Sequence, residues 1–586
     1  MGNSCGVNMW FLAYFLLHLV IYTILRLEFL IWNRSAFAVI STSDLTLAFL
    51  NGVRFDLSAL AALVGLCLLP LPWLGKKRTF RQGWLLLFIA INGVFILINA
   101  ADTELFNFTA KRFSASSFYL LQDAHVSNLI TPYIPLALAS LLILFAYVVL
   151  AVRLANRFSY QGNWKKNLGA SFAILLIAIL CSRGGIQLKP LTFVDAKIFD
   201  NAFANNLVLN SSFTVLKSAT RNSLLKVRHY DQNQLLSLLN PQDIAPVKVN
   251  LSKPNVVVVI LESFSEEYSK LRNPEVMPYF NHLRLRGVDF KNSFANGRRS
   301  IEGIAAILSG IPALMEDPFI NSEFSANQII GLGTILEAHG YRTNFFHGAN
   351  LGSMHFDSFT KSVGIQNYYS IESYPEKNDS DGTWGIFDEP FLQWTCAKLT
   401  EQKGPFFSAI FTLTSHQPYK LPEKYVNRFR DDRLDILKGI QYTDYSLEQF
   451  MKCAETKPWY RNTLFIFTAD HTGPALKAGA DFKSRYEVPL VFFYPDRSVL
   501  KDVDSTQYAQ HIDLLPTLLD MLQIENKNKN YLARSLLRLG PKFIALYSDS
   551  KYELVGDVKD EPAQLKAVQQ YFSEGMYDNR LYYPSK

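Results

Sequence analysis

Five long apolar segments are the strongest constraint on how this 586-residue chain can fold. They run over residues 9–32, 57–74, 84–101, 130–152 and 168–181. Because a helix needs about 20 apolar residues to cross a bilayer, each segment predicts a membrane-spanning helix, and the last one is the shortest. A cleaved signal peptide would supply only one short apolar region. We therefore predict a domain of five transmembrane helices over residues 1–182.

The loops between these segments predict the orientation of the chain. The loop after the second segment carries Lys76, Lys77, Arg78 and Arg81, and the loop after the fourth is also basic. Since Lys and Arg accumulate in cytoplasmic loops, both loops should face the cytoplasm, and everything after the fifth segment should lie outside. We expect a multi-pass protein of the bacterial cytoplasmic (inner) membrane whose large C-terminal region is extracytoplasmic.

Charged residues and cysteines exclude several classes of protein. Arg54 and Asp56 lie at the entrance of the second segment, where we expect an interfacial charge pair. The segments otherwise contain almost no ionisable residues, which argues against a transporter, because a transport path usually needs them. A net charge of +7 without basic blocks interleaved with aromatics predicts no nucleic-acid partner. Five scattered cysteines predict no disulfide framework.

The sequence pattern changes after residue 250. Short apolar runs then alternate with amphipathic stretches, and the β-branched run at 256–261 is typical of a strand buried on both faces of a parallel sheet. Such alternation predicts an α/β domain with a mainly parallel sheet over residues 251–586. Residues 183–250 are polar and rich in Asn and Ser, and we predict a linker along the membrane surface there.

Metal-binding side chains follow several of the predicted strands. Glu262 follows the first strand, Asp470 and His471 follow "TLFIFTA", and His347 and His416 end two others. In open α/β sheets, sites form at the carboxyl ends of strands. Each residue alone is more typical of a cap or a structural side chain. Together, two carboxylates and an imidazole suit one catalytic divalent cation, Zn²⁺ or Mn²⁺.

Ser300 precedes the helical run "IEGIAAILSG". A serine in this position is usually an N-cap. The same position also favours anions, and next to a divalent cation the hydroxyl could attack phosphorus or sulfur. The local sequence leaves both interpretations open.

The motifs that hold these residues follow one another in the order of a known family. "NVVVVILES", "FANGRRSIEGIAAILSGIP", "FFHGAN", "TLTSHQPY" and "FTADHTG" resemble the lipoteichoic acid synthase-like branch of the sulfatase and alkaline phosphatase superfamily. The resemblance implies an alkaline phosphatase-like α/β sandwich after five transmembrane helices. It implies Glu262, Asp470 and His471 as metal ligands, and Ser300 as a further ligand and the nucleophile.

The resemblance also implies how substrate is bound. It makes His347 and His416 the pair that contacts the phosphate or assists the leaving group. The loop after "FFHG" departs from the Trp/Asn/Arg pattern of the family, and Asn350 and Asp357 are the candidate substrate contacts there, beside His355. The transferred headgroup therefore stays open between phosphoglycerol and phosphoethanolamine.

The implied reaction moves this headgroup from a membrane phospholipid to a glycan or lipid acceptor through a covalent Ser300 intermediate. A phosphodiesterase or phosphatase with water as acceptor, and a non-catalytic lipid-binding sensor, are the alternatives. "SIEGI" lacks the Pro and Arg that a formylglycine sulfatase needs.

Five further residues are not assigned to the reaction. We interpret Trp384, Asp388 and His511 as structural. Arg298 and Arg299, which precede Ser300, could meet a phosphate or lie on the surface.

Overall fold

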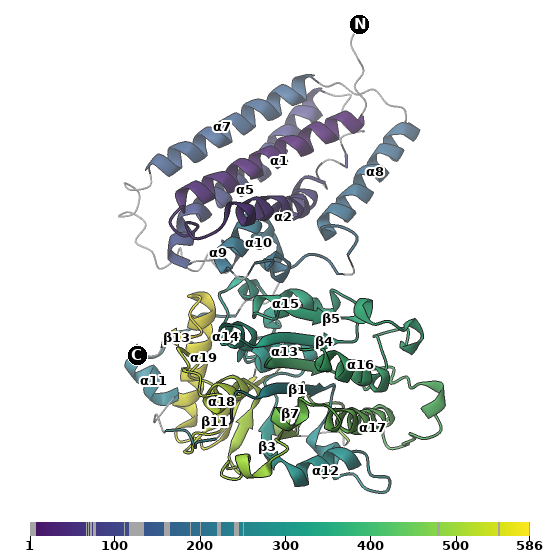
Figure 1. Ribbon diagram of the computed structural model, residues 1–586. Coiled ribbons are helices and arrows are strands. Elements are labelled where there is room, and N and C mark those ends of the chain that lie inside the picture. The colour runs from purple at the N-terminus through teal and green to yellow at the C-terminus, as the bar shows by residue number, and fades with distance from the viewer. Residues whose placement is uncertain are drawn as a thin grey trace. The chain divides into compact units, whose positions relative to one another are not determined.

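The computed structural model describes residues 7–65, 67, 69–70, 73, 78–109, 112–115, 134–157, 164–187, 189–199, 201–219, 224–239, 245–249, 251–476, 481–548 and 551–584. The chain divides into two compact units, which are described separately (Figure 1). The helical unit comprises Met1–Ser223 and Asn321–Asn327, and the α/β unit comprises Leu224–Ile320 and Gln328–Lys586.

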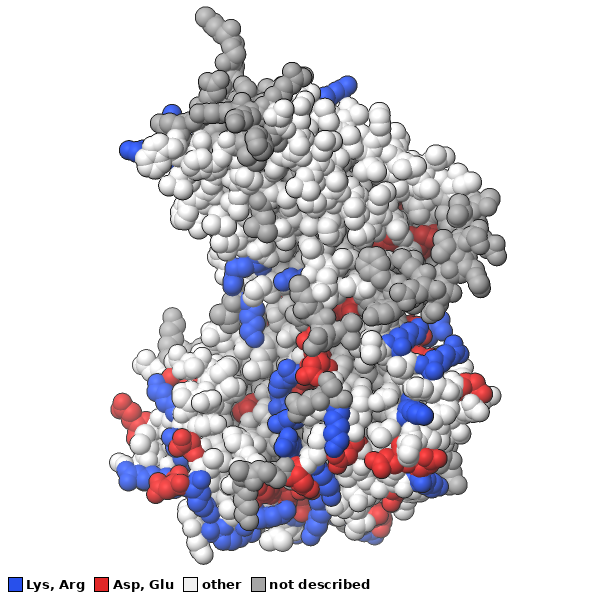
Figure 2. Space-filling model, turned by 180° about the vertical axis from the view of Figure 1, so that it is seen from behind, with Lys and Arg blue, Asp and Glu red and all other residues white. Residues whose placement is uncertain are grey.

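Five helices of the helical unit are long and apolar enough to cross a membrane, as predicted. They are α1 (Val7–Trp32), α2 (Thr42–Leu60, continued by a π-helical turn over Ala61–Gly65), α5 (Arg78–Thr109), α7 (Ile134–Arg157) and α8 (Trp164–Arg183). Leu138, Leu142 and Phe145 of α7 expose more than three fifths of their side chains, at 63%, 67% and 66%. The visible face of this unit carries few charged side chains (Figure 2). Such a surface suits contact with lipid. Lys76 and Lys77, which carry part of the orientation argument, lie outside the described residues.

The second span begins earlier than predicted. The helix starts at Thr42, where Ser41 accepts a hydrogen bond from the Asp44 amide, and the candidate span runs over Thr42–Leu63. Arg54 and Asp56 misled the prediction because they interrupt the apolar pattern. Arg54 is exposed, whereas Asp56 is buried.

Asp56 pairs with Arg26 of α1 rather than with Arg54. Arg26 Nη1 lies 2.6 Å from Asp56 Oδ2 and Nη2 lies 2.8 Å from Oδ1, and both side chains are almost completely buried. A second buried pair joins Arg112 to Asp102 at 2.7 Å. The expectation that the spans contain almost no ionisable residues was therefore wrong.

Two short helices, α9 (Ala202–Val208) and α10 (Ser211–Ser218), complete the helical unit. Arg26 donates to the carbonyl oxygens of Leu207 and Val208, Asn210 Nδ2 donates to Asp56, and Ser211 Oγ donates to Asp102. Residues that we assigned to a surface linker are thus hydrogen-bonded to the spanning helices.

A seven-stranded sheet forms the centre of the α/β unit, in the order β2-β8-β7-β1-β6-β4-β5. The strands are β1 (Asn255–Leu261), β2 (Val288–Asp289), β4 (Arg342–His347), β5 (Asn367–Tyr369), β6 (Phe406–Phe411), β7 (Thr463–Ala469) and β8 (Leu490–Phe493). The five strands from β7 to β5 are parallel, and β8 runs antiparallel to both of its neighbours, β7 and β2. The predicted α/β class with a mainly parallel sheet is confirmed.

Helices and small sheets surround this sheet. The helices are α12 (Pro278–Arg286), α13 (Ser300–Ser309), α14 (Leu332–Ala338), α15 (Phe356–Ser362), α16 (Asp388–Thr400), α17 (Ile436–Glu455), α18 (Leu514–Met521), α19 (Glu561–Tyr577) and α11 (Gln232–Leu239). The small sheets pair β3 (Asn292–Phe294) with β9 (Tyr508–Gln510), β10 (Asn528–Lys529) with β13 (Tyr583–Pro584), and β11 (Phe543–Ser548) with β12 (Lys551–Gly556). Val257, Val259 and Leu261 of β1 share one apolar core with α12, α16 and α17. These three helices therefore cover one face of the sheet.

A disulfide joins Cys396 of α16 to Cys453 of α17. The cysteine pattern, which predicted no disulfide framework, gave no sign of this single bond, because a separation of 57 residues has no local signature. The two cysteines meet because α16 and α17 pack side by side on the sheet (Figure 1).

Candidate metal and nucleophile site

The site begins with two buried carboxylates at the carboxyl edge of the sheet. Glu262 directly follows β1, and Asp470 directly follows β7. Because β1 and β7 are parallel neighbours with Leu261 opposite Ala469, the two side chains that follow must lie together. Glu262 is 2% exposed and Asp470 is 0% exposed.

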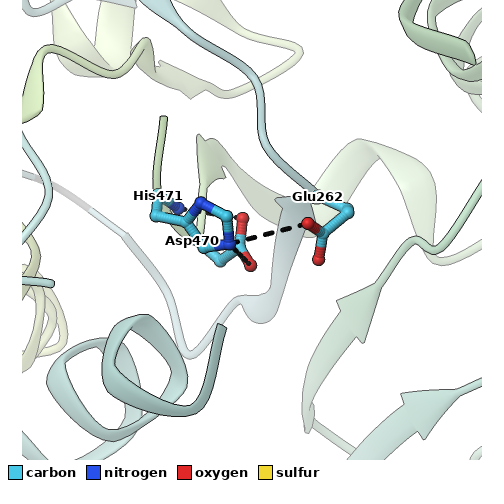
Figure 3. Close-up of side chains that lie close together, drawn as sticks. All are labelled: Glu262, Asp470 and His471. Atoms are coloured by element: carbon cyan, nitrogen blue, oxygen red, sulfur yellow. Dashed lines mark hydrogen bonds and ion pairs between the residues drawn. The ribbon is translucent and has the colours of Figure 1, made fainter. Parts of the chain in front are cut away.

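His471 completes this group (Figure 3). Its Nε2 lies 3.5 Å from Glu262 Oε1 and 3.3 Å from Asp470 Oδ2, and one potential ligand atom from each of the three residues lies within 4.8 Å of the others. His471 Nδ1 lies 2.8 Å from the carbonyl oxygen of Thr472. Nδ1 must therefore carry the proton and donate it, which leaves the Nε2 lone pair facing the carboxylates.

The hydrogen bonds of the carboxylates leave room for a cation. Asp470 Oδ1 accepts from the amides of Ser263 at 2.9 Å and His471 at 2.8 Å, and Glu262 Oε1 accepts from Ser263 Oγ at 2.6 Å. Asp470 Oδ2 is buried and accepts no hydrogen bond from the described residues. A buried, unsatisfied carboxylate oxygen beside an imidazole lone pair fits a divalent metal ion.

The pKa shifts of Asp470 and His471 also support a bound divalent metal ion. Burial and, after it, the charge of Glu262 raise the pKa of Asp470 to about 7 against the opposing effect of His471. Burial lowers the pKa of His471, but Asp470 and Glu262 outweigh this effect and raise it overall. Two like charges held together in a buried position lack a compensating cation.

Ser300 brings a hydroxyl to this group. It is the first residue of α13, is 4% exposed, and lies with Oγ 3.1 Å from Glu262 Oε2 and 3.3 Å from His471 Nε2. The N-cap of α13 is Arg299, so the Ser300 hydroxyl is not used as the cap. Of the two interpretations that the sequence left open, the geometry favours the one in which the hydroxyl faces the metal-binding group.

Gly303 allows α13 to approach the end of β7. A Cβ atom on this residue would lie 2.2 Å from the carbonyl oxygen of Asp470, so only glycine fits between the helix and the strand end. The sequence analysis missed this role, although a glycine three residues after the candidate nucleophile was a visible signal.

Arg298 and Arg299 are engaged by neighbours of the site. Glu302 accepts from the amide of Arg298 at 2.8 Å and from Arg299 Nε at 2.8 Å, and Arg298 Nη1 donates to Ser548 at 2.9 Å. Both arginines thus stabilise the turn that precedes Ser300.

His416 lies within electrostatic reach of the group, after β6. Its half-buried ring lies 3.7 Å from the ring centre of Trp384, whose Nε1 donates to the carbonyl oxygen of Gln417 at 2.5 Å. Burial lowers the pKa of His416, and the charge of Asp470 partly opposes the shift. Trp384, which we interpreted as structural, therefore contacts a candidate catalytic side chain.

Asp388 and His511 have the surroundings of structural residues. Asp388 accepts from the amides of Leu413 at 2.8 Å and Thr414 at 3.2 Å, and so fixes the chain that follows β6 to α16. His511 is 1% exposed, with Nε2 3.5 Å from Thr468 Oγ1, and burial lowers its pKa to about 3.

Three other predicted site residues lie outside this cluster. His347 is 1% exposed, its Nδ1 lies 2.9 Å from the Tyr368 hydroxyl, and its ring stacks on Phe411. Burial lowers the pKa of His347 to about 3, so the ring is neutral. Asn350 is exposed, and Asp357 is half-buried on α15. Their contact with substrate stays a prediction.

Part of the α/β unit resembles known proteins. Residues 254–524 match the Sulfatase family model. An alkaline phosphatase superfamily protein from Vibrio parahaemolyticus has a similar structure, with a TM-score of 0.52 at 22% identity over 61% of this chain and 98% of that one.

Two curated relatives match parts of the chain. The lipoteichoic acid synthase-like protein YvgJ of Bacillus subtilis (strain 168) is 25% identical over 308 residues, which cover 48% of this chain and 49% of the relative. Phosphoglycerol transferase I of Citrobacter koseri is 24% identical over 428 residues, 68% of this chain and 49% of the relative. The chain thus spans about half the length of the curated relatives it matches.

Proposed function

We propose that this protein is a metal-dependent phosphotransferase. It moves a phosphoglycerol or phosphoethanolamine group from a membrane phospholipid to a glycan or lipid acceptor, and Ser300 carries the group between them. The observation that carries this proposal is the Ser300 hydroxyl, 3.1 Å from Glu262 and 3.3 Å from His471 in a buried group of metal-binding side chains. The names of the relatives, lipoteichoic acid synthase-like protein and phosphoglycerol transferase, support the class of transferred group.

Glu262, Asp470, His471 and Ser300 would hold one divalent cation, Mn²⁺ or Zn²⁺. When bound, this cation would supply Lewis acidity, which lowers the pKa of a hydroxyl and neutralises charge on phosphoryl oxygens. The unsatisfied Asp470 Oδ2 and the outward lone pair of His471 Nε2 are the observations that support this assignment.

The residues of the chain itself account for the two transfer steps. Glu262 Oε2 accepts the hydrogen bond of Ser300 Oγ and so orients the attacking oxygen. This oxygen gives up its proton to solvent and forms a bond to phosphorus as the bond to the diacylglycerol oxygen breaks, and His416 or water protonates that leaving oxygen. An acceptor hydroxyl then attacks phosphorus, loses its proton to His416 or water, and displaces Ser300 Oγ, which takes up a proton from solvent. The amides at the N-terminus of α13 favour the negative charge throughout.

The same proposal places the α/β unit outside the cytoplasmic membrane. The five apolar helices and the basic loops support this orientation. The disulfide between Cys396 and Cys453 supports it independently, because disulfides persist in oxidising compartments. A membrane-impermeant maleimide should label these cysteines on intact cells only after reduction. Labelling that requires permeabilised cells would contradict the orientation.

Two alternatives remain as outcomes of the main test. A hydrolase would use the same residues with water as acceptor. A lipid-binding sensor without catalysis is disfavoured, because all four candidate ligands converge.

Mass spectrometry of the intact protein tests the covalent step. The full-length protein in nanodiscs with Mn²⁺ and mixed phospholipids should gain one headgroup mass on Ser300, and Ser300→Ala should gain none. Ser309→Ala at the other end of α13 is the matched control, because that buried hydroxyl donates only within the helix, and it should keep the adduct. Turnover in Ser300→Ala would disprove the intermediate, and release of the free headgroup without acceptor labelling would identify a hydrolase.

A further inference from the structure

The α/β unit contains a second hollow, between α12 and α17, which the proposed reaction does not use. Its volume is about 700 Å³, within the range of small-molecule sites. We call it the α12–α17 groove. The lining residues that matter for the argument are Tyr279, His282, Arg428, Tyr445, Glu448 and Glu455.

The groove has a rigid floor. Asp444 of α17 is 1% exposed and accepts from the amides of Tyr279 at 2.9 Å and Phe280 at 2.8 Å. These two amides begin α12, so Asp444 caps that helix from α17. The contact fixes the separation of the two helices, and the groove is therefore preformed.

Aromatic rings form its walls. The guanidinium of Arg428 lies 4.1 Å from the ring centre of Tyr445 and 5.0 Å from that of Phe429. Cation–π contacts of this kind fix the orientation of the rings. The Tyr279 hydroxyl and the His282 ring nitrogens form no hydrogen bond with the described residues. The walls thus combine flat apolar faces with unused polar groups.

The charges of the groove balance. Glu448 pairs with Lys452 at 2.8 Å, and Glu455 approaches Arg286 at 3.8 Å. The lining has four acidic side chains (Glu275, Asp444, Glu448 and Glu455) and three basic ones (Arg286, Arg428 and Lys452), so little net charge is left to select an anion or a cation. It offers acceptors and donors side by side, which suits a ligand with many hydroxyl groups.

We propose that the α12–α17 groove binds an uncharged glycan, the acceptor of the transfer reaction. The tyrosine rings stack on the C–H faces of the sugars, and the paired charged side chains bind their hydroxyls. A lipid acceptor would need a continuous apolar surface instead. The identification of this glycan as the acceptor rests on the proposed phosphotransferase function.

The groove leads toward the candidate active site. It follows α17 from Gln441 to Glu455, which at 1.5 Å per residue is about 21 Å. Gly439, at the start of α17, packs against Ser415, where an added Cβ would lie 3.0 Å from the Cα. Ser415 is followed by His416. A glycan chain in the groove therefore points one end toward the segment that carries His416.

Binding and transfer measured separately test this proposal. A neutral β-linked gluco-oligosaccharide is titrated into the full-length protein in nanodiscs by calorimetry. Arg428→Ala and Tyr445→Ala should each weaken binding about tenfold, which is about 1.4 kcal/mol, whereas Tyr445→Phe keeps the ring and should bind normally. Arg430→Ala, an exposed arginine outside the groove, is the matched control. Unchanged binding in both Arg428→Ala and Tyr445→Ala would overturn the site.

The transfer reaction distinguishes this proposal from the proposed function. Arg428→Ala should form the Ser300 adduct at the normal rate but pass the group to the oligosaccharide about tenfold more slowly at low acceptor concentration. If the wild-type protein never forms the adduct, the proposed function fails, and calorimetry still decides whether the groove binds glycan. Binding of anionic polymers alone, abolished by salt, would overturn the assignment of an uncharged ligand.

Discussion

Buried carboxylates occur in both units of the molecule, and their surroundings differ. In the helical unit, Asp56 accepts two hydrogen bonds from Arg26 and one from Asn210. In the α/β unit, Glu262 and Asp470 lie beside each other without a lysine or arginine partner among the described residues. The first arrangement satisfies its own charge, and the second needs a positive charge from outside the chain.

This contrast separates structural from functional carboxylates better than burial does. Asp388 and Asp444 are as buried as Asp470, but backbone amides satisfy them. Asp470 instead has one oxygen that accepts no hydrogen bond from the described residues. A missing cation, rather than a buried charge, is therefore the feature that identifies the site.

The largest expected effect comes from replacing Asp470, whose buried carboxylate lacks a cation among the described residues. Asp470→Asn should lower the rate of headgroup transfer roughly 10²–10³-fold, the size expected when preorganised electrostatic stabilisation is lost. Metal at 100 times its Kd should stabilise the wild-type protein by about 2.7 kcal/mol. Asp470→Asn should lose this stabilisation, because the amide is a poorer ligand. Thermal unfolding of both proteins with and without Mn²⁺ measures the stabilisation, and release of the headgroup over time measures the transfer rate.

Asp388→Asn is the matched control for this experiment. It removes a carboxylate that is equally buried but satisfied by amides and the Thr443 hydroxyl. It should lower stability equally with and without metal. Retention of the metal effect in Asp470→Asn, or its loss in Asp388→Asn, would break the comparison.

The next largest effect is on stability and concerns the buried ion pair between Arg26 and Asp56 in the helical unit. Arg26→Met leaves Asp56 buried without its cation and should destabilise the folded protein by about 3–5 kcal/mol. The double variant Arg26→Met/Asp56→Leu removes both charges and should recover most of this loss. Unfolding in mixed detergent micelles measures the difference. Equal destabilisation in the single and double variants would show that packing, not charge, governs this position.

The strand ends of the candidate site were visible in the sequence because local physics determines them. Val256–Leu261 and the run before Asp470 are β-branched and aromatic enough to be buried strands, and each ends at a metal-binding side chain. Parallel pairing then brings Glu262 and Asp470 together. The fold class and the strand-end positions of these residues therefore follow from sequence patterns, and the pairing of β1 with β7 in the structure brings them together.

Features that depend on a distant partner could not be predicted in this way. The start of α2 was missed because Asp56 seemed too polar for a span until Arg26 was placed beside it. The contact of Trp384 with His416 depends on the Asp381 carboxylate, which accepts from the Trp384 amide at 2.8 Å and sets the turn. Arg26 is far from Asp56 in the sequence, and His416 is far from Trp384, so no local spacing marks either contact.

The smallest effect concerns His347, a buried base that the fold keeps neutral beside Tyr368. Burial lowers its pKa to about 3, below the unfolded value of 6.5. The unfolded chain therefore takes up a proton below pH 6.5 while the folded chain does not, so this contribution is complete above pH 6.5 and is lost as the pH falls toward 3.

His347→Gln should remove this part of the acid sensitivity. Between pH 6.5 and pH 5, the wild-type protein should lose about 2 kcal/mol more stability than the variant, at 1.36 kcal/mol per unit of pH. Thermal unfolding of both proteins across this range measures the difference, and the same substitution at the exposed His339 should leave the wild-type dependence unchanged. Equal acid sensitivity in His347→Gln and wild type would mean that His347 takes up its proton in the folded state, as a ring open to the candidate active site would. That outcome would group His347 with Asp470, as a buried side chain whose polar atoms are available to a ligand, and not with Asp388, whose hydrogen bonds are made within the fold.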